Sequence, residues 1–416
     1  MKISNIRKEE QDDKTLLIAD VESAKFERDS HHTIWMSLPR EYGEYLIDNR
    51  YDGFLVALFY SAMAYGEDIE IEGVVSEKLL YNVKEYVIHI LLAYSPWLKK
   101  INISAKETTD EVIHSAVHVG TGFSGGVDSF CTVYDKFVKE TNPKFKIDTL
   151  VNFNVGNYYG RNPDETDALF QQAYQRLSGY PNFAGLPYIP VNSSMAYIYN
   201  EKWNFQKVHL LHTIAGVLTM QNYFCRYYFA SSIAYRDLPD FVKTYKDFDI
   251  AAFCDVFICQ FLSTETLALI PDGHQYSRVE KTERISHYAP TCDFLEVAPR
   301  DETGKQDVLR PKSIRVLTTL DALDKLELYA KVFDLEKYRK HRFYMKCKQV
   351  LDYKKNVHAT AIIDLAHLHG KKYPNLFVSF LYVNMKEYKQ IVRRIVPERV
   401  RKILRTIINK SNNRNG

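Results

Sequence analysis

The chain is poor in cysteine and lacks the patterns that cysteine forms in zinc sites and disulfide frameworks. Its six cysteines, among 416 residues, include no CxxC pair and follow no regular spacing. Most of them stand among apolar neighbours, which favours buried, reduced thiols in a cytoplasmic protein. No apolar run approaches the ~20 residues of a transmembrane helix, and the segment Met1–Glu10 is charged, without the apolar stretch of a signal peptide. We therefore expect a cytoplasmic protein with no transmembrane segment.

A strong net charge is also missing. The formal net charge of +3 is too small to indicate a nucleic-acid-binding protein by itself. The hydrophobic content of 46% and the charged content of 26% are those of an ordinary globular protein. The metalloprotease motif HExxH is absent, and His358, His367 and His369 have no paired carboxylates at metal-ligand spacing. Function has to be sought in other motifs.

The segment Thr121-Gly-Phe-Ser-Gly-Gly-Val-Asp-Ser129 has the residues of a phosphate-binding loop. Residues 116–123 before it alternate as a buried strand does, and residues 127–139 after it carry apolar side chains at helical spacing. A strand, a glycine turn and a helix can direct backbone N–H groups and a helix N-terminus at an anion. No Gly-Lys-Ser/Thr follows, so the segment is not a Walker A loop.

The hexapeptide Ser124-Gly-Gly-Val-Asp-Ser129 resembles the SGGxDS signature of the PP-loop ATP pyrophosphatases, the N-type adenylating enzymes. This family includes asparagine synthetase, the GMP and NAD synthetases and 7-cyano-7-deazaguanine synthase. The resemblance implies a HUP-type, Rossmann-like α/β core that binds ATP with Mg²⁺. It further implies that Asp128 orients the loop or contacts Mg²⁺, and that the nucleotide is held by Phe123, Ser124, Gly125, Gly126, Val127, Ser129, Phe153 and Asn154, the backbone at Phe123, Phe153 and Asn154 facing the adenine.

A second segment, Ser277-Arg-Val-Glu-Lys-Thr282, reads as the start of a helix after an Asp272-Gly273 turn. Arg278 and Lys281 stand three residues apart and so share one face. They are candidates to neutralise the negative charge that develops as ATP loses pyrophosphate. The alternative is an ordinary surface, where the two cations pair with Asp272, Glu280 or Glu283.

The layout resembles one bacterial branch of this family, in which a cysteine cluster follows an SRVEKT-like segment. Here Asp307, Arg310 and Ser313 stand at the positions of those cysteines, while Lys312-Ser-Ile-Arg315 and Thr319-Leu-Asp-Ala-Leu323 follow the branch's pattern. Zinc needs thiolates, which these side chains do not supply. We expect no zinc site, and at most an ion pair between Asp307 and Arg310.

Three regions are expected: an α+β module over residues 1–110, an ATP pyrophosphatase domain over 111–312, and a helical module over 313–416 with helices at 316–333, 339–353, 359–368 and 377–395. The middle region alternates strands and helices, which is typical of a parallel α/β sheet. The tail Arg399–Lys410 has the pattern of a basic amphipathic helix. It could contact an anionic membrane or polymer, or be a solvated face over packed Ile and Leu side chains.

The resemblance implies an ATP-dependent ligase that releases AMP and pyrophosphate while activating a carboxylate or carbonyl oxygen of a small molecule, sugar or base. Ammonia or an amine then attacks, and because no glutaminase pattern is visible, ammonia would come free or from a partner protein. Two alternatives stay open: a non-catalytic sensor of adenine nucleotides, and a deazaguanine-synthase-like modification of a macromolecule or capsule sugar. Cys131, near the start of the motif helix, either has a lowered pKa or is packed under the sheet; His209 and His212, on an apolar helix, are expected in the core.

Overall fold

The computed structural model describes residues 1–25, 31–158, 160, 162–198, 205–240 and 250–395. The chain divides into two compact units, Met1–Val297 and Ala298–Gly416, which are described one at a time. The second unit begins at Ala298, whereas the helical module is expected to begin at residue 313. The expected boundary at 110/111 lies inside the first unit, where one sheet runs through both regions.

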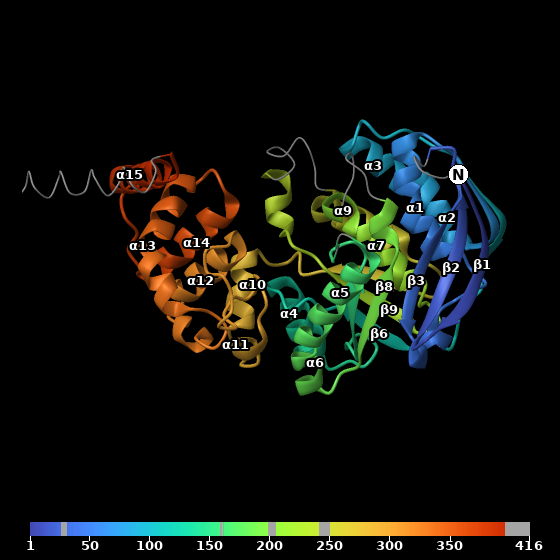
Figure 1. Cartoon of the computed structure of the whole chain (residues 1–416), viewed down its shortest axis with the longest axis horizontal. Coiled ribbons are helices and arrows are strands. Elements are labelled where there is room, and N and C mark those ends of the chain that lie inside the picture. The colour runs from blue at the N-terminus through green and yellow to red at the C-terminus, as the bar shows by residue number, and fades with distance from the viewer. Residues whose placement is uncertain (26–30, 159, 161, 199–204, 241–249, 396–416) are drawn as a thin grey trace, which may run out of the picture. The chain divides into compact units, whose positions relative to one another are not determined.

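Unit 1 is an α/β structure built on a mostly parallel sheet of ten strands (Figure 1). Their order across the sheet is β10-β9-β6-β7-β8-β3-β2-β1-β4-β5. In chain order the strands are β1 (Lys2–Gln11), β2 (Lys14–Glu22), β3 (His31–Pro39), β4 (Ile69–Ser76), β5 (Ile103–Thr109), β6 (His118–Gly122), β7 (Thr149–Asn154), β8 (Tyr188–Ser193), β9 (Phe224–Ala230) and β10 (Ala268–Asp272).

The strands β8, β7, β6, β9 and β10 are parallel neighbours and form the part of the sheet that positions the site. Numbered from β6, their spatial order is 3-2-1-4-5, which is compatible with a Rossmann-like core. The chain moves outward from β6 in one direction through β7 and β8, and then returns to the other side of β6 for β9. The gap between the carboxyl ends of β6 and β9 is therefore the topological switch point, where ligands bind in sheets of this type.

The first hundred residues extend this sheet instead of forming a second one. The strand β3 pairs antiparallel with β8, with Met36 opposite Ser193 and Ser37 opposite Asn192. The helix α1 (Asp52–Tyr65) is apolar around most of its circumference and buried over most of its length. A helix of that kind needs neighbours on several sides, and α1 packs against α7 (Phe205–Leu218) from the middle region. A shared core joins residues 1–110 to the rest of unit 1.

Among the other helices of unit 1, α5 is the longest, with 15 residues. Asn162 caps α5 and Ser76 caps α2 through side-chain oxygens that accept a backbone N–H, as expected for Ser76. The α-helices with their bounds are α2 (Glu77–Asn82), α3 (Ile88–Tyr94), α4 (Val127–Val133), α5 (Pro163–Leu177), α6 (Gly179–Ala184), α9 (Ile250–Ile258), α10 (Arg278–Ile285) and α11 (Thr291–Phe294). Of these, α9 packs on α7, and α10 packs on α4.

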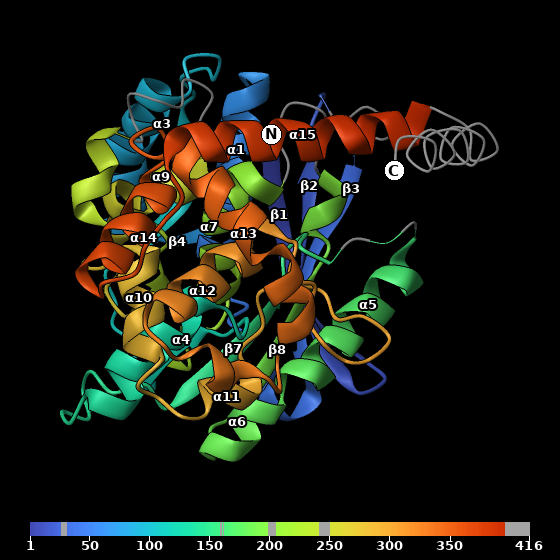
Figure 2. The same cartoon turned by 90° about the vertical axis from the view of Figure 1, so that its left-hand side faces the viewer.

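Unit 2 is helical, as expected, with α12 (Pro311–Ala322), α13 (Leu335–Asp352), α14 (Val357–Leu368) and α15 (Leu376–Ile395) (Figure 2). The expectation of one helix over 316–333 was wrong. Asp324 adopts a left-handed φ of 57°, which ends the regular helix, and a short 3₁₀ turn, Leu326–Tyr329, follows. The helix α14 packs on α12, and α13 contacts both α14 and α15. The basic tail Arg399–Lys410 lies outside the described residues.

Within the described residues, no helix combines the length and the apolar composition needed to cross a bilayer.

Candidate functional site

The Ser124–Ser129 motif forms the tight connection between β6 and α4, as the sequence predicts. Gly125 has a φ of +69°, in the left-handed region that favours glycine. A Cβ atom on Gly125 would lie 3.0 Å from the Cβ of Glu296, and the Glu296 amide donates a 2.7 Å hydrogen bond to the Gly125 carbonyl. Glycine is therefore required here both by the backbone conformation and by the closeness of Glu296.

The two serines of the motif lie together at the mouth of the loop. Ser129 Oγ donates to the Gly126 carbonyl over 3.0 Å, and it lies 3.5 Å from Ser124 Oγ. Gly126 is the N-cap of α4, and no side chain of the described residues accepts from the first turn at this cap. The motif thus presents a helix start and the Ser124 hydroxyl, which can donate to an anion, while the Ser129 hydroxyl would have to turn away from the Gly126 carbonyl to do so.

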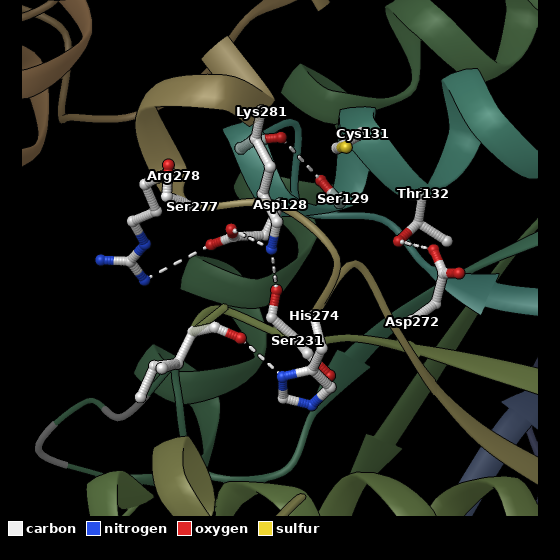
Figure 3. Close-up of polar contacts among 12 residues, drawn as sticks. Asp128, Ser129, Cys131, Thr132, Ser231, Asp272, His274, Ser277, Arg278 and Lys281 are labelled. Atoms are coloured by element: carbon white, nitrogen blue, oxygen red, sulfur yellow. Dashed lines mark hydrogen bonds and ion pairs between the residues drawn. The ribbon is translucent and has the colours of Figure 1, made fainter. Parts of the chain in front are cut away.

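Asp128, in the first turn of α4, pairs with both candidate cations (Figure 3). Its Oδ1 lies 3.1 Å from Lys281 Nζ, and its Oδ2 lies 3.4 Å from Arg278 Nη2. The side chains of Asp128 and Arg278 are about one quarter exposed, whereas Lys281 is fully buried. The alternative of an ordinary surface pairing with acids of α10 or with Asp272 was wrong: the cations reach 150 residues back along the chain to the glycine motif.

Lys281 joins the two sides of the switch point. Besides Asp128, its ammonium group donates to the carbonyl oxygen of Ser231, the residue that follows β9 (Figure 3). Gly273 makes room for this contact, because a Cβ at that position would lie 3.1 Å from Lys281 Nζ. Lys281 therefore links the loop after β6 to the loop after β9, at the place where the strand order predicts a ligand.

The start of α10 sets the direction of these cations. Ser277 and Glu280 form a reciprocal capping box, in which the Ser277 amide donates to Glu280 Oε2 over 2.8 Å and the Glu280 amide donates to Ser277 Oγ over 3.3 Å. Glu280 also pairs with Arg236. Because Glu280 is held by its own cap, Arg278 and Lys281 are directed toward α4.

Asp272 is buried behind the loop and contacts α4 instead of α10. Its Oδ2 accepts a 2.9 Å hydrogen bond from Thr132 Oγ1, and its Oδ1 lies 3.4 Å from Lys136 Nζ. Burial raises the pKa of this carboxyl above its usual range, in part against the effect of the nearby Lys136 charge. Asp272 therefore connects the end of β10 to α4, the helix that follows the motif.

The residues expected near an adenine lie at the ends of β6 and β7, with buried side chains. The Phe123 amide donates to Val151 O over 2.8 Å, and its carbonyl accepts from Tyr188 Oη over 2.9 Å. Asn154 is 1% exposed and donates to Asn192 Oδ1 over 2.8 Å. Phe153 is also buried. The side chains of these three residues are therefore used for packing and for hydrogen bonds within the protein.

Two candidates with reactive side chains prove to be core residues. Burial raises the pKa of the Cys131 thiol to about 12, so the alternative of a lowered pKa was wrong and the packed alternative is confirmed. Burial lowers the pKa of His212 to about 4, and this side chain is 2% exposed. Both groups are held neutral by the apolar interior near pH 7.

In unit 2, the positions expected to replace zinc cysteines form the anticipated ion pair. Arg310 Nε lies 3.4 Å from Asp307 Oδ2, and Lys337 Nζ lies 3.6 Å from Asp307 Oδ1. Ser313 is buried, and its hydroxyl has no hydrogen-bond partner among the described residues. Across the described ranges, no group of three or more His, Cys, Asp or Glu side chains is placed to hold a metal ion.

Sequence reasoning missed one contributor to the site. Glu296 contacts Gly125 from beyond α11, and no motif surrounds it.

Comparisons with protein-family models, curated proteins and solved structures gave no match. The fold and the site therefore define the class by themselves: an α/β protein with a glycine–serine loop, one carboxylate and two cations gathered at the switch point of a mostly parallel sheet.

Proposed function

We propose that this protein is an ATP-dependent adenylating enzyme with a HUP-type core, related to the PP-loop ATP pyrophosphatases. The observation that carries the proposal is the convergence of Arg278 and Lys281 on Asp128 of the glycine motif. A fully buried lysine is costly unless an anion or several hydrogen-bond acceptors surround it. Here one protein carboxylate and one carbonyl surround the ammonium group, at the position where this class of sheet binds ligands.

At Gly126 neither the backbone conformation nor the protein's own packing requires glycine. Gly126 has an ordinary φ of −79°, and a Cβ there would meet no atom closer than Ser124 Oγ at 3.4 Å. The protein would tolerate a side chain at this position, but a phosphate group approaching the backbone would not. The two motif hydroxyls and the start of α4 supply donors on the same side.

The cations would act on the leaving pyrophosphate. In the ligand-free arrangement Asp128 neutralises Lys281 and Arg278. A bound triphosphate would compete for the same two cations, and Asp128 would then act as a ligand of Mg²⁺. Since the site offers one carboxylate, most of the ligands of Mg²⁺ would be phosphate oxygens and water, as is usual for this ion. Mg²⁺ would supply further neutralisation of the phosphate charge.

The reaction then has two steps. A substrate oxygen, from a carboxylate or carbonyl, attacks the α-phosphorus; the bond to the β-phosphate oxygen breaks, and pyrophosphate leaves with its electron pair. Fixed positive charge beside that leaving group stabilises the transition state. Ammonia or an amine next attacks the activated carbon, AMP leaves, and the nitrogen loses a proton. The site contains no lysine of the Walker type, so we expect AMP and pyrophosphate as products and not ADP and phosphate.

Product analysis tests the proposal directly. ATP labelled at the α- or the γ-phosphate is incubated with Mg²⁺, ammonia and a panel of carboxylate, sugar and base acceptors. We expect label in AMP and in pyrophosphate, and we expect Asp128→Asn to abolish both. Label in ADP would contradict the adenylation mechanism. ATP binding with no pyrophosphate release for any acceptor would favour a nucleotide sensor.

A further inference from the structure

The charge of this protein is divided between its two units. Residues 298–416 contain 27 Lys and Arg against 12 Asp and Glu, a net charge of +15, whereas residues 1–297 contain 28 against 40, a net charge of −12. The overall value of +3 hides this division. A basic segment in an otherwise acidic chain indicates an anionic partner for that segment.

Unit 2 also exposes an apolar surface on its last described helix. Among residues 376–387, the part of α15 whose side chains the structure describes, Ser379 and Val383 are buried, and α15 packs against α13. The remaining surface carries large apolar side chains that are 40% to 70% exposed: Leu376, Phe377, Val378, Phe380, Leu381 and Met385. Single exposed apolar residues are common on soluble proteins, but a contiguous set of this size marks a binding surface.

We infer that the exposed face of α15, together with the net positive charge of residues 371–416, binds the surface of an anionic lipid bilayer. Interfacial helices combine an apolar face that enters the acyl boundary with cationic residues that attract anionic headgroups. The segment 371–416, which contains α15, has twelve Lys and Arg against two Glu. Such a polybasic segment is attracted to anionic lipids.

The net charge of residues 371–416 and the apolar face of α15 together favour an anionic bilayer over a second copy of this chain or a nucleic acid. A second copy placed on the same face would bring two segments of net charge +10 together, and they would repel each other. A nucleic acid would satisfy the basic charge but would leave aliphatic groups such as Leu376, Val378 and Leu381 against phosphates and water. An anionic bilayer satisfies the charge and covers the apolar face.

Vesicle flotation with the full-length protein tests the inference. We expect binding to vesicles of phosphatidylglycerol and phosphatidylcholine, and little binding to pure phosphatidylcholine. The triple variant F377S/F380S/L381S should bind the anionic vesicles roughly tenfold more weakly or worse, because it removes three exposed apolar groups. The matched control is Leu328→Ser, which removes a side chain of unit 2 that is 56% exposed but lies outside α15; it should bind as the wild type does. Circular dichroism melting checks that all variants are folded.

Each other outcome overturns the inference. Equal binding of the triple variant and the wild type would mean electrostatic adsorption alone. A dimer by light scattering that is lost in the triple variant would make the face a self-association surface. Binding to single-stranded or duplex DNA with no binding to vesicles would assign the basic unit to nucleic acid. Pyrophosphate release is measured separately, so a failure here leaves the proposed reaction unaffected.

Discussion

At the scale of single residues, the most informative side chain is Lys281, because it is fully buried and its charge has only two partners in the structure's described part: the Asp128 carboxylate and the Ser231 carbonyl. A lysine placed for packing alone would extend its ammonium group to water. Here the stem fills space beside Gly273 and the charge points at the glycine motif. That arrangement suits a group whose charge is used on a ligand.

We expect Lys281→Met to lower the rate of pyrophosphate formation by roughly 10²- to 10³-fold, the usual effect of removing one group that stabilises transition-state charge. ATP affinity should fall much less, since the charge matters most as pyrophosphate leaves. Methionine keeps the buried volume, and Asp128 keeps Arg278 as a partner, so the fold should survive. Single-turnover kinetics and equilibrium nucleotide binding separate the two effects.

The matched control is Lys136→Met. Lys136 lies in the π-helical segment Tyr134–Lys139 that continues α4, and it pairs with Asp272, 3.4 Å away. The substitution Lys136→Met removes one positive charge from the same region, but the Lys136 side chain pairs with Asp272 and not with Asp128 of the motif. A comparable loss of rate in both variants would mean that the region needs positive charge in general and that Lys281 has no special role.

Cys131 gives a second residue-scale prediction. Burial raises the pKa of its thiol to about 12, and Asp135 adds to the shift. The thiolate, which is the reactive form, is therefore scarce at pH 8. Iodoacetamide should label Cys131 in the folded protein far more slowly than Cys225, which is only partly buried, and equally fast in urea. Mass spectrometry of peptides gives both rates; fast labelling of Cys131 in the native protein would show that the thiol is accessible.

At the scale of helices and strands, the sequence predicted the elements that carry the site and missed several that surround it. Residues 116–139 gave β6, the loop and α4 because a strand, two glycines and an apolar helical pattern are all local signals. The cap of α10 was visible in the same way, as Ser277 followed three residues later by Glu280. Local sequence signals of this kind predict an element independently of its tertiary contacts.

The missed strands have physical reasons. β1 breaks its alternation where Asn5 takes a left-handed φ of 51° and the pairing register shifts between Ser4 and Arg7, so its pattern does not read as a strand. β10 contains Pro271, which reads as a strand breaker, but β10 is an edge strand and tolerates it. The pairing of β3 with β8 joins residues that are 157 and 155 positions apart in the chain (Met36 with Ser193, Ser37 with Asn192), and no local sequence pattern predicts such a pairing. For the same reason, the partner of Lys281 could not be chosen from the sequence.

The turn between β10 and α10 leads to a test of how the site is supported. Gly273 has a φ of +93°, and a Cβ there would press on Lys281 Nζ at 3.1 Å. Gly273→Ala should cost roughly 1–3 kcal/mol of stability and should also weaken pyrophosphate formation, because Lys281 is displaced. Gly185→Ala is the control: its φ is +66°, but a Cβ there meets nothing within 4 Å. It should lose stability and keep activity; equal activity losses in the two variants would contradict this account of Gly273.

Two buried groups on packed helices should give opposite pH dependences. Burial raises the pKa of Asp52, on α1, from 3.8 to about 6, although Ser76 and Gln221 donate to it. In this range the folded protein keeps a proton on Asp52 that the unfolded chain loses. The contribution of Asp52 to the free energy of unfolding therefore falls as the pH rises from about 4 to about 6. Burial lowers the pKa of His212, on α7, from 6.5 to about 4. The unfolded chain gains that proton first, so this contribution falls as the pH drops from about 6.5 to about 4.

In the wild type these two contributions should nearly cancel between pH 4 and pH 6. Relative to the wild type, we expect Asp52→Asn to become more stable as the pH rises through this range, and His212→Gln to become less stable. Each difference should change by about 1.4 kcal/mol per pH unit. Urea unfolding at several pH values measures both; parallel curves for the variants and the wild type would mean that neither group has its expected pKa.

At the scale of the whole molecule, the division of charge is the dominant property, and composition alone conceals it. A net charge of +3 describes neither unit, since residues 1–297 carry −12 and residues 298–416 carry +15. Screening limits each charge to about 10 Å at 0.1 M salt, a distance much shorter than the size of either unit. A charged surface that approaches the protein therefore interacts with the net charge of one unit and not with the net charge of the whole chain.

We expect the intact protein at pH 7 and low salt to be retained by a cation exchanger through residues 298–416 and, in a separate run, by an anion exchanger through residues 1–297. A protein with +3 spread evenly would be held weakly by the first and would pass through the second. The variant R401E/K402E/R405E lowers the charge of the basic unit by six and should elute earlier from the cation exchanger, with unchanged retention on the anion exchanger, because the altered residues belong to the unit of opposite charge. Flow-through of the wild type on the anion exchanger would show that the acidic surface of residues 1–297 is not available to partners.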